Sequence, residues 1–333
     1  MAADGLSELL DQLPEPDQGA SDAVLARAGR VLRPVGALAR LDAIAAWMAG
    51  WQRSAAPRVR APAGIVFAAD HGVVEEGVSA YPSEVTRAMV KAIEDGVATA
   101  SVFARSVGAR LDVVDVGVGL PSGNIVTGPA LDRDRFDESI RAGRDAVAAS
   151  GCDLLILGEV GIGNTTSAAA ICAALFGEGA IRWTGRGAGL DDASYARKIA
   201  VVDRAVARLG GHTSPLEVLR ELGGTELAAI AGATIEARLR STPVLLDGFV
   251  VGAAVAALHL ARPGALAHCL AGHRSEEPGH DRLLVRLGMT PLLDLSLRLG
   301  EGTGALAAVP LIRLACDAVT GVATFEEWGL ERP

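Results

Sequence analysis

The chain has 333 residues, and half of them are apolar, which suffices for a large core in one or two α/β domains. Its formal net charge is −9, from 31 basic and 40 acidic residues. This balance argues against a nucleic-acid-binding protein, which usually has a basic face, and against binding to an anionic membrane. The four cysteines form no C-x-x-C pair, and the first residues are polar and acidic. We therefore expect buried free thiols, no signal peptide and a cytoplasmic protein.

The N-terminal part of the chain has a polar first segment, which is followed by a segment predicted to be helical. Residues 1–20 are polar and contain two prolines, so we expect them to be loosely ordered. In residues 21–60, apolar residues recur at helical spacing, with a break at Pro34 and Gly36.

Residues 61–280 alternate short apolar runs with Ala-rich helical patterns. Five runs predict strands: GIVFAAD, LDVVDVG, CDLLILG, PVLLDG and ALAHCLAG. Strands that are apolar on both faces and separated by helices indicate a mainly parallel sheet with helices on both faces, an α/β fold. The last segment, residues 281–333, is predicted to be helical as far as about Val319, with a glycine-rich interruption at 300–304.

Polar residues gather where the predicted strands end. They are Asp70 and His71, Glu159 to Thr166, Asp247, and His273 to His280. Ligands of parallel sheets bind beyond the carboxyl ends of the strands. The sequence therefore predicts a binding site at this edge of the sheet.

The segment GEVGIGNTTSAAA is typical of an anion-binding turn. Gly161 and Gly163 let backbone N–H groups approach an anion, and the helix that starts at Asn164 adds partial positive charge. The Thr pair that follows can cap the helix or bind a phosphate oxygen. No Lys precedes this pair, so the loop is not a Walker A loop. A ligand-free capped turn has the same pattern, but the acidic Glu159 inside the loop favours a site.

The segment RLGEGTGA holds Glu301 between two glycines. A carboxylate that is partly desolvated at such a corner has a raised pKa and can accept a proton near neutral pH. Taken alone, the motif is more typical of a helix end followed by a solvated Glu.

The segment TGRGAGLDDASYARK contains a second glycine-rich loop. Gly187 and Gly189 precede Asp191 and Asp192, which are candidates to cap the helix that carries Lys198. The loop is either a linker with surface charges or a second phosphate-facing loop with Lys198 as the counter-charge.

Histidines and serines leave two further questions open. His71 lacks the spacing of a metal ligand set, so a hydrogen-bonded structural role is favoured. Ser275, Glu277 and His280 either contact a ribose or a base or only order their turn. A Pro-containing stretch that starts at Ser79 can line a pocket for a flat apolar ring.

Together, these motifs resemble the nicotinate-nucleotide–dimethylbenzimidazole phosphoribosyltransferase family. The matching segments occur in family order from about Arg33 to the end of the chain, and they include FAADHGVVEEGVSAYPSEVT, GEVGIGNTTSAAA, GRGAGLDD, PVLLDGF, HRSEEPGH and LLDLSLRLGEGTGA. The resemblance implies a large Rossmann-like domain over residues 61–280 and a small helical domain built from 21–60 and 281–333. It also implies a homodimer with sites near the interface.

The resemblance further implies roles for particular residues. Glu301 is expected to be the general base and Glu159 the second active-site carboxylate. The expected phosphate and ribose site comprises Gly161, Gly163, Asn164, Thr165, Gly187, Gly189 and Lys198, and the expected base pocket comprises Ser79, Tyr81, Ser83, Ser275 and Leu299. The implied substrates are nicotinate mononucleotide and a benzimidazole-type base, with no metal and no cofactor. The family usually has Gln at the position of Ser83, which leaves the accepted base open.

Two other functions fit parts of the pattern. The strand–GxGxxT–helix segment is an imperfect dinucleotide fingerprint, which would suggest an NAD-binding oxidoreductase. That fold requires an acid about 20 residues past the glycines, whereas Asp191 and Asp192 lie farther along and inside another glycine loop. A non-catalytic homologue that binds a base or a nucleotide is the second alternative, and the presence of both Glu159 and Glu301 argues against it.

Overall fold

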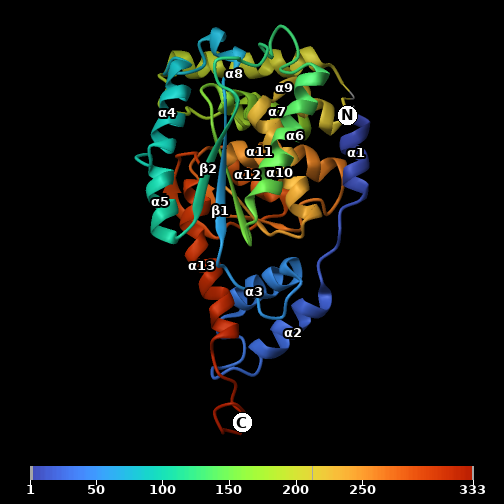
Figure 1. The fold of residues 1–333 in the computed structure, drawn as a ribbon. Coiled ribbons are helices and arrows are strands. Elements are labelled where there is room, and N and C mark those ends of the chain that lie inside the picture. Colours follow the sequence, from blue (N-terminus) through green and yellow to red (C-terminus); the bar gives the residue numbers. More distant parts are fainter. Residues whose placement is uncertain (1–2, 212, 332–333) are drawn as a thin grey trace.

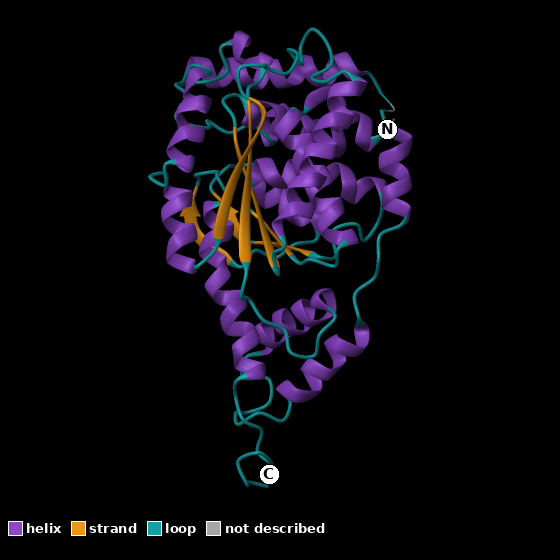
Figure 2. Cartoon of the chain, viewed as in Figure 1, coloured by secondary structure: helices purple, strands orange, loops and turns teal. Residues whose placement is uncertain are grey.

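The computed structural model describes residues 3–211 and 213–331, and its centre is a parallel five-stranded sheet (Figures 1 and 2). All four strand pairings are parallel, in the order β2-β1-β3-β4-β5. The strands are β1 (Pro62–Ala69), β2 (Arg110–Gly117), β3 (Leu154–Val160), β4 (Val244–Leu246) and β5 (Cys269–Ala271). The five predicted strands and the parallel α/β fold are thus confirmed.

The strand order reverses between β1 and β3. The chain moves outward from β1 to β2 and then returns to the other side of β1 to form β3. Such a reversal leaves a crevice at the carboxyl ends of the two central strands, where α/β sheets bind their ligands. Asp70 and His71 follow β1 at this edge, and β3 ends there with Glu159 and Val160.

Helices cover both faces of the sheet (Figure 1). One face packs against α4 (Glu84–Glu94), α5 (Thr99–Val107) and α13 (Thr303–Thr320), and the other against α6 (Arg133–Ser150), α10 (Thr225–Leu239) and α11 (Phe249–Ala261). Alternate residues of β3 serve the two faces: Leu155 and Leu157 join the core under α10 and α11, while Leu154 and Ile156 join the core under α13. The remaining helices are α7 (Asn164–Phe176), α8 (Asp192–Leu209), α9 (Pro215–Leu222) and α12 (His280–Leu287), with short 3₁₀ turns at Gly72–Glu76 and Ala180–Arg182.

Segments from the two ends of the chain lie side by side below the sheet (Figure 1). Helices α2 (Gln18–Ala28) and α3 (Ala39–Gln52) pack together and against α13. Arg27 Nε donates to the carbonyl of Val319 at 2.9 Å, and Val31 forms an antiparallel bridge with Thr324. The division of the chain into a large and a small domain stays a prediction, and these contacts support it.

The expectation that residues 1–20 are loosely ordered is wrong for most of that segment. Helix α1 spans Ala3–Asp11, and α2 begins at Gln18. Leu6 and Leu10 lie one helical turn apart, so both reach the same face and are buried in the main core. Met1 and Ala2 lie outside the described residues.

The expectation of a helical segment from residue 281 onward is partly wrong. Helix α12 ends at Leu287, and Leu293–Leu297 forms a strand, β7, that pairs in parallel with β6 (His273–Ser275). Gly288, in the left-handed conformation with a φ of 66°, ends α12, and the segment LDLSL that follows alternates apolar and polar residues with the period of a strand. This small sheet brings the segment before Glu301 alongside the segment after β5.

Helix α13 is long and apolar enough to cross a membrane by length and composition, but most of it is buried against α3, α5 and β3, as in a core helix.

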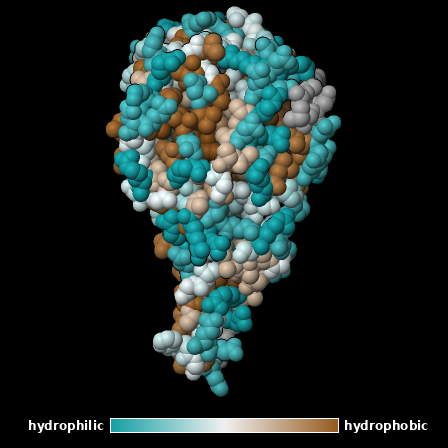
Figure 3. All heavy atoms as spheres, in the orientation of Figure 1, coloured by the Kyte–Doolittle hydropathy of each residue, from teal (hydrophilic) through white to brown (hydrophobic). Residues whose placement is uncertain are grey.

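Strand β2 is an edge strand of the sheet, with half-buried Val113, Val114 and Val116, and Figure 3 shows apolar atoms gathered over this edge. All four cysteines are free thiols, as predicted; Cys172, Cys269 and Cys316 are buried, whereas Cys152 is half-buried.

Candidate active site

A cavity of about 560 Å³ lies at the carboxyl ends of the strands. It collects residues from the β3–α7 loop, the loop before α8, the start of α11 and the segment between β7 and α13. Most of the predicted site residues line it: Glu159, Glu301, Gly161, Gly163, Asn164, Thr165, Gly187, Lys198, Ser79, Ser275 and Leu299.

Three predicted site residues do not line this cavity. Tyr81 is half-exposed on the surface, although its carbonyl accepts a hydrogen bond from the Ser79 hydroxyl at 2.9 Å. Ser83 lies at the start of α4, where its carbonyl accepts the Thr86 N–H. Gly189 lies in a turn closed by its N–H and the Arg186 carbonyl.

The two predicted catalytic carboxylates meet at one wall of the cavity. Glu159 lies near the end of β3, and Glu301 lies in the tight turn before α13. The N–H of Glu301 donates to the carbonyl of Glu159 at 2.9 Å, so the two backbones are in direct contact. Glu159 is 8% exposed and Glu301 is 4% exposed.

The turn that holds Glu301 is fixed from two sides. Glu301 has a φ of 66°, a left-handed conformation that costs a non-glycine residue free energy and persists only where surrounding contacts enforce it. Asp247, which follows β4, accepts the N–H of Gly302 at 3.1 Å and the N–H of Ala305 at 3.0 Å, and thereby caps α13. Gly158 of β3 lies so close that a Cβ there would overlap the Gly302 backbone.

Burial raises the pKa of both carboxyl groups. The pKa of Glu159 rises to about 8, mainly because the group is buried and further because Asp247, Glu226 and Glu301 are nearby; the amide of Asn164 opposes this by donating to it. The pKa of Glu301 is raised by burial and by Asp247, against a hydrogen bond from the Ala100 N–H at the start of α5. With a pKa of about 8, Glu159 can exchange a proton near neutral pH.

Another part of the cavity contains a buried cation, Lys198. Lys198 of α8 is 1% exposed, and its Nζ donates to Thr165 Oγ1 at 2.8 Å and to the carbonyl of Gly185 at 3.1 Å. Burial lowers the pKa of this lysine to about 8, and the charge of Glu277 opposes the shift. A buried cation beside the N-terminus of α7 and a glycine-rich loop is the arrangement that binds phosphate.

The threonine pair of the β3–α7 loop acts differently from the expected cap. The N-cap residue of α7 is Gly163, with a φ of 98°, and no side chain caps the helix. Thr165 bonds Lys198 instead, and Thr166 Oγ1 is buried with no partner among the described residues. In α8, by contrast, the predicted cap is confirmed, because Asp191 accepts the Ser194 N–H at 2.7 Å.

His71 has the hydrogen-bonded structural role that the sequence favours. Its Nε2 lies 2.6 Å from Glu226 Oε1, and its Nδ1 lies 3.1 Å from Ser167 Oγ. Within residues 3–211 and 213–331, no three His, Cys, Asp or Glu side chains are grouped so as to hold a metal ion.

The cavity also contains residues that the sequence motifs did not single out. Arg186, Arg298 and Phe249 line it. Arg298 follows β7, in a segment whose apolar pattern predicts a helix. Arg186 could have been found from the sequence, because it is a basic residue inside the glycine-rich loop.

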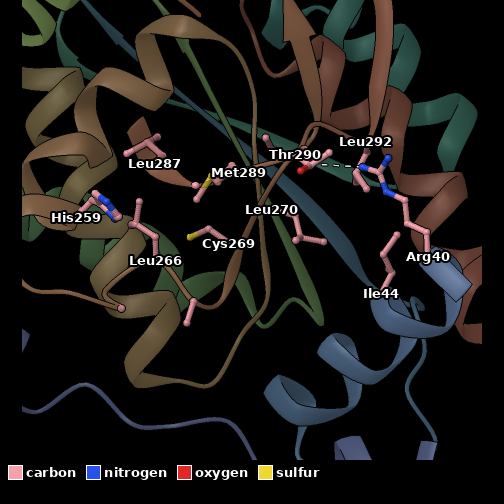
Figure 4. Close-up of a pocket in the computed structure, with 14 residues that line it drawn as sticks. Arg40, Ile44, His259, Leu266, Cys269, Leu270, Leu287, Met289, Thr290 and Leu292 are labelled. Atoms are coloured by element: carbon pink, nitrogen blue, oxygen red, sulfur yellow. Dashed lines mark hydrogen bonds between the residues drawn. The ribbon is translucent and has the colours of Figure 1, made fainter. Parts of the chain in front are cut away.

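A second cavity, of about 420 Å³, lies along the outer edge of β5 and contains none of the predicted site residues (Figure 4). Its wall is mostly apolar, with Leu266, Leu270 and Leu292 among the residues shown. Arg40 reaches across it to the carbonyls of Thr290 and Pro291. This lining offers little chemistry beside that of the first cavity.

Comparisons with known proteins agree with this geometry. The profile of a family described as phosphoribosyltransferase matches residues 13–330. The nicotinate-nucleotide–dimethylbenzimidazole phosphoribosyltransferase of Cereibacter sphaeroides is 46% identical over 327 residues, covering 98% of this chain and 96% of the relative. That of Mesorhizobium japonicum is 48% identical over 319 residues, covering 96% of this chain and 95% of the relative.

A solved structure gives the same result in three dimensions. The crystal structure of the nicotinate-nucleotide–dimethylbenzimidazole phosphoribosyltransferase from Thermus thermophilus matches with a TM-score of 0.89 and 40% identity, over 95% of this chain and all of that one. Identity at this level over nearly the whole length decides the family. The chain belongs to the nicotinate-nucleotide–dimethylbenzimidazole phosphoribosyltransferase family.

Proposed function

We propose that this protein transfers the phosphoribosyl group of nicotinate mononucleotide to 5,6-dimethylbenzimidazole or a related base. The products are nicotinate and an α-ribazole 5′-phosphate, used in cobalamin nucleotide-loop biosynthesis. The observation that carries the proposal is that two buried carboxylates and a buried lysine line one cavity at the edge of the sheet.

The donor phosphate occupies the part of the cavity next to Lys198. Thr165, Gly187 and the backbone N–H groups at the start of α7 surround the same space. The lysine charge and the helix N-terminus both favour a phosphate there. This arrangement fixes the nucleotide and leaves its C1′ to face Glu159 and Glu301.

Transfer replaces one C1′–N bond by another. The bond to the pyridinium nitrogen of nicotinate breaks, and its electron pair neutralises that nitrogen, so departure needs little acid catalysis. The base nitrogen attacks the opposite face of C1′, which converts a β-nucleotide into an α-ribotide. The positive charge that develops on the ribose favours the ionised form of Glu159, and the resulting carboxylate stabilises that charge. Positioning the two substrates in line contributes as much as ~7–11 kcal/mol in well-oriented systems.

Attack leaves the new ribotide with a proton on the base, and Glu301 removes it. Burial raises the pKa of Glu301, and a carboxylate with a raised pKa is a stronger base than an ordinary one. The aromatic acceptor lies against Leu299, Ser79 and Ser275, which line the cavity beside apolar Phe249. Tyr81 and Ser83 lie outside the cavity, so their place in the base pocket depends on movement of their loop.

A dehydrogenase function is less well supported by the site. It would need an acidic residue free to bind the ribose 2′-hydroxyl of NAD. Asp191 instead caps α8, and Asp192 is bonded to Arg186.

We also propose that the protein is a cytoplasmic homodimer. Free thiols agree with a reducing compartment, and the apolar unpaired edge at β2 is a surface of the kind that protein interfaces cover (Figure 3). Light scattering at micromolar concentration should give twice the mass of one chain. The mass of a single chain under these conditions would contradict the dimer.

The reaction is tested by incubating the protein with nicotinate mononucleotide and a panel of benzimidazoles, purines and phenols. Mass spectrometry should detect free nicotinate and a ribotide in equal amounts, with the largest yield for a benzimidazole. Binding of the base without any ribotide would indicate the non-catalytic alternative.

A further inference from the structure

A further acidic side chain, Glu277, lines the active-site cavity near Lys198. It follows β6 in a turn that is held firmly: its N–H donates to Ser275 Oγ at 3.1 Å, and its carbonyl accepts the His280 N–H at 2.9 Å. The N–H of Ser275 in turn donates to His280 Nδ1 at 2.8 Å. The turn therefore fixes the direction in which the Glu277 side chain leaves the backbone.

The carboxylate of Glu277 has an unused oxygen. Oε2 is buried and has no hydrogen-bond partner among the described residues. It lies against Gly185, where a Cβ would overlap it, so this glycine makes room for the carboxylate. A buried acceptor that stays unpaired costs free energy, and a ligand that donates to it would remove this cost.

The ligand groups that could occupy this part of the cavity are separated by their chemistry. The phosphate and the nicotinate carboxylate of the donor are disfavoured next to Glu277 because all three groups are negative, and the proposed phosphate partner is Lys198. A benzimidazole belongs with the apolar lining around Leu299 and Phe249. A ribose hydroxyl is a neutral donor, and the ribose adjoins the phosphate that Lys198 would bind.

We propose that the Glu277 carboxylate accepts a hydrogen bond from a ribose hydroxyl of the nucleotide donor and so selects a ribonucleotide over a deoxyribonucleotide. This inference rests on the proposed function only in its choice of donor. Electrostatics agree with it: burial raises the pKa of Glu277 while the charges of Lys198 and Arg298 lower it, and a hydroxyl donor would further favour the ionised form.

The test compares the affinity of the protein for nicotinate mononucleotide and for its 2′-deoxy and 3′-deoxy analogues by calorimetry. In the wild-type protein, one analogue should bind about 10- to 150-fold more weakly, as for the loss of a hydrogen bond to a charged group. In Glu277→Ala the ribonucleotide should weaken by the same factor while that analogue is unaffected, so that the gap closes. Glu277→Gln, which keeps a neutral acceptor, should give an intermediate gap.

Glu276→Gln is the matched control, because the neighbouring Glu276 is exposed and paired with Arg274. It should leave all three affinities unchanged. Equal weakening of every nucleotide in Glu277→Ala would overturn the proposal, since it would indicate a structural role or a phosphate contact. A full wild-type gap in Glu277→Ala would overturn it too. Because only binding is measured, absence of ribotide synthesis would refute the proposed function without deciding this inference.

Discussion

Replacing Glu301 by glutamine is expected to lower kcat about 10²- to 10⁴-fold, the range that general-base catalysis contributes. Glutamine has nearly the same size and can occupy the same turn, but its amide cannot take the proton that leaves the base. Nucleotide affinity should change little, since the proposed phosphate contacts are with Lys198 and its neighbours. The measurement is the initial rate of ribotide formation with saturating substrates.

The pH dependence of kcat is a second test of the role of Glu301. Burial and Asp247 raise the pKa of Glu301, so this residue stays protonated, and useless as a base, to higher pH than an ordinary carboxyl group. The kcat of the wild type should therefore fall as the pH is lowered through this raised value, and the variant should lack that dependence. Glu138→Gln, on the exposed side of α6, is the control for the substitution itself. Unchanged turnover in Glu301→Gln would remove the residue from the base role.

The parallel sheet could be predicted because the information is local. Runs such as LLILG are apolar on both faces and end in a glycine turn, and they become the central strands. The site could be placed for the same reason, since polar residues follow these runs and parallel strands end at one edge. Strand β7 could not be predicted with the same ease although LDLSL alternates in polarity, because the apolar residues on either side of it also suit a helix.

The support of the site could not be read from the sequence. Asp247 is recognisable as a polar residue at a strand end, but its bonds to the N–H groups of Gly302 and Ala305 exist only after folding. The same holds for Lys198, whose partner Thr165 was expected either to cap α7 or to bind a phosphate oxygen. Pairings between distant segments are set by tertiary packing, and no local sequence pattern predicts them.

Lys198→Ala is expected to raise the KM for nicotinate mononucleotide about 10- to 150-fold, the cost of losing a hydrogen bond to a charged group, with a smaller effect on kcat. The chain carries its positive charge almost entirely on arginine, and Lys91 is the only other lysine. Lys91 is exposed on α4 and pairs with Asp95, so Lys91→Ala is a control of the same residue type that should leave the KM unchanged.

A lysine at this buried position makes nucleotide capture depend on pH in a predictable direction. With a pKa of about 8, Lys198 is charged below this pH and neutral above it, so kcat/KM for the nucleotide should fall as the pH rises through about 8. A bound phosphate favours the charged form of Lys198 and so raises its pKa in the complex. The fall in kcat should therefore occur at a higher pH than the fall in kcat/KM. Lys198→Ala should be insensitive in this range, because no charge remains to be lost. An unaltered alkaline fall in this variant would mean that another group titrates there and that the phosphate is held elsewhere.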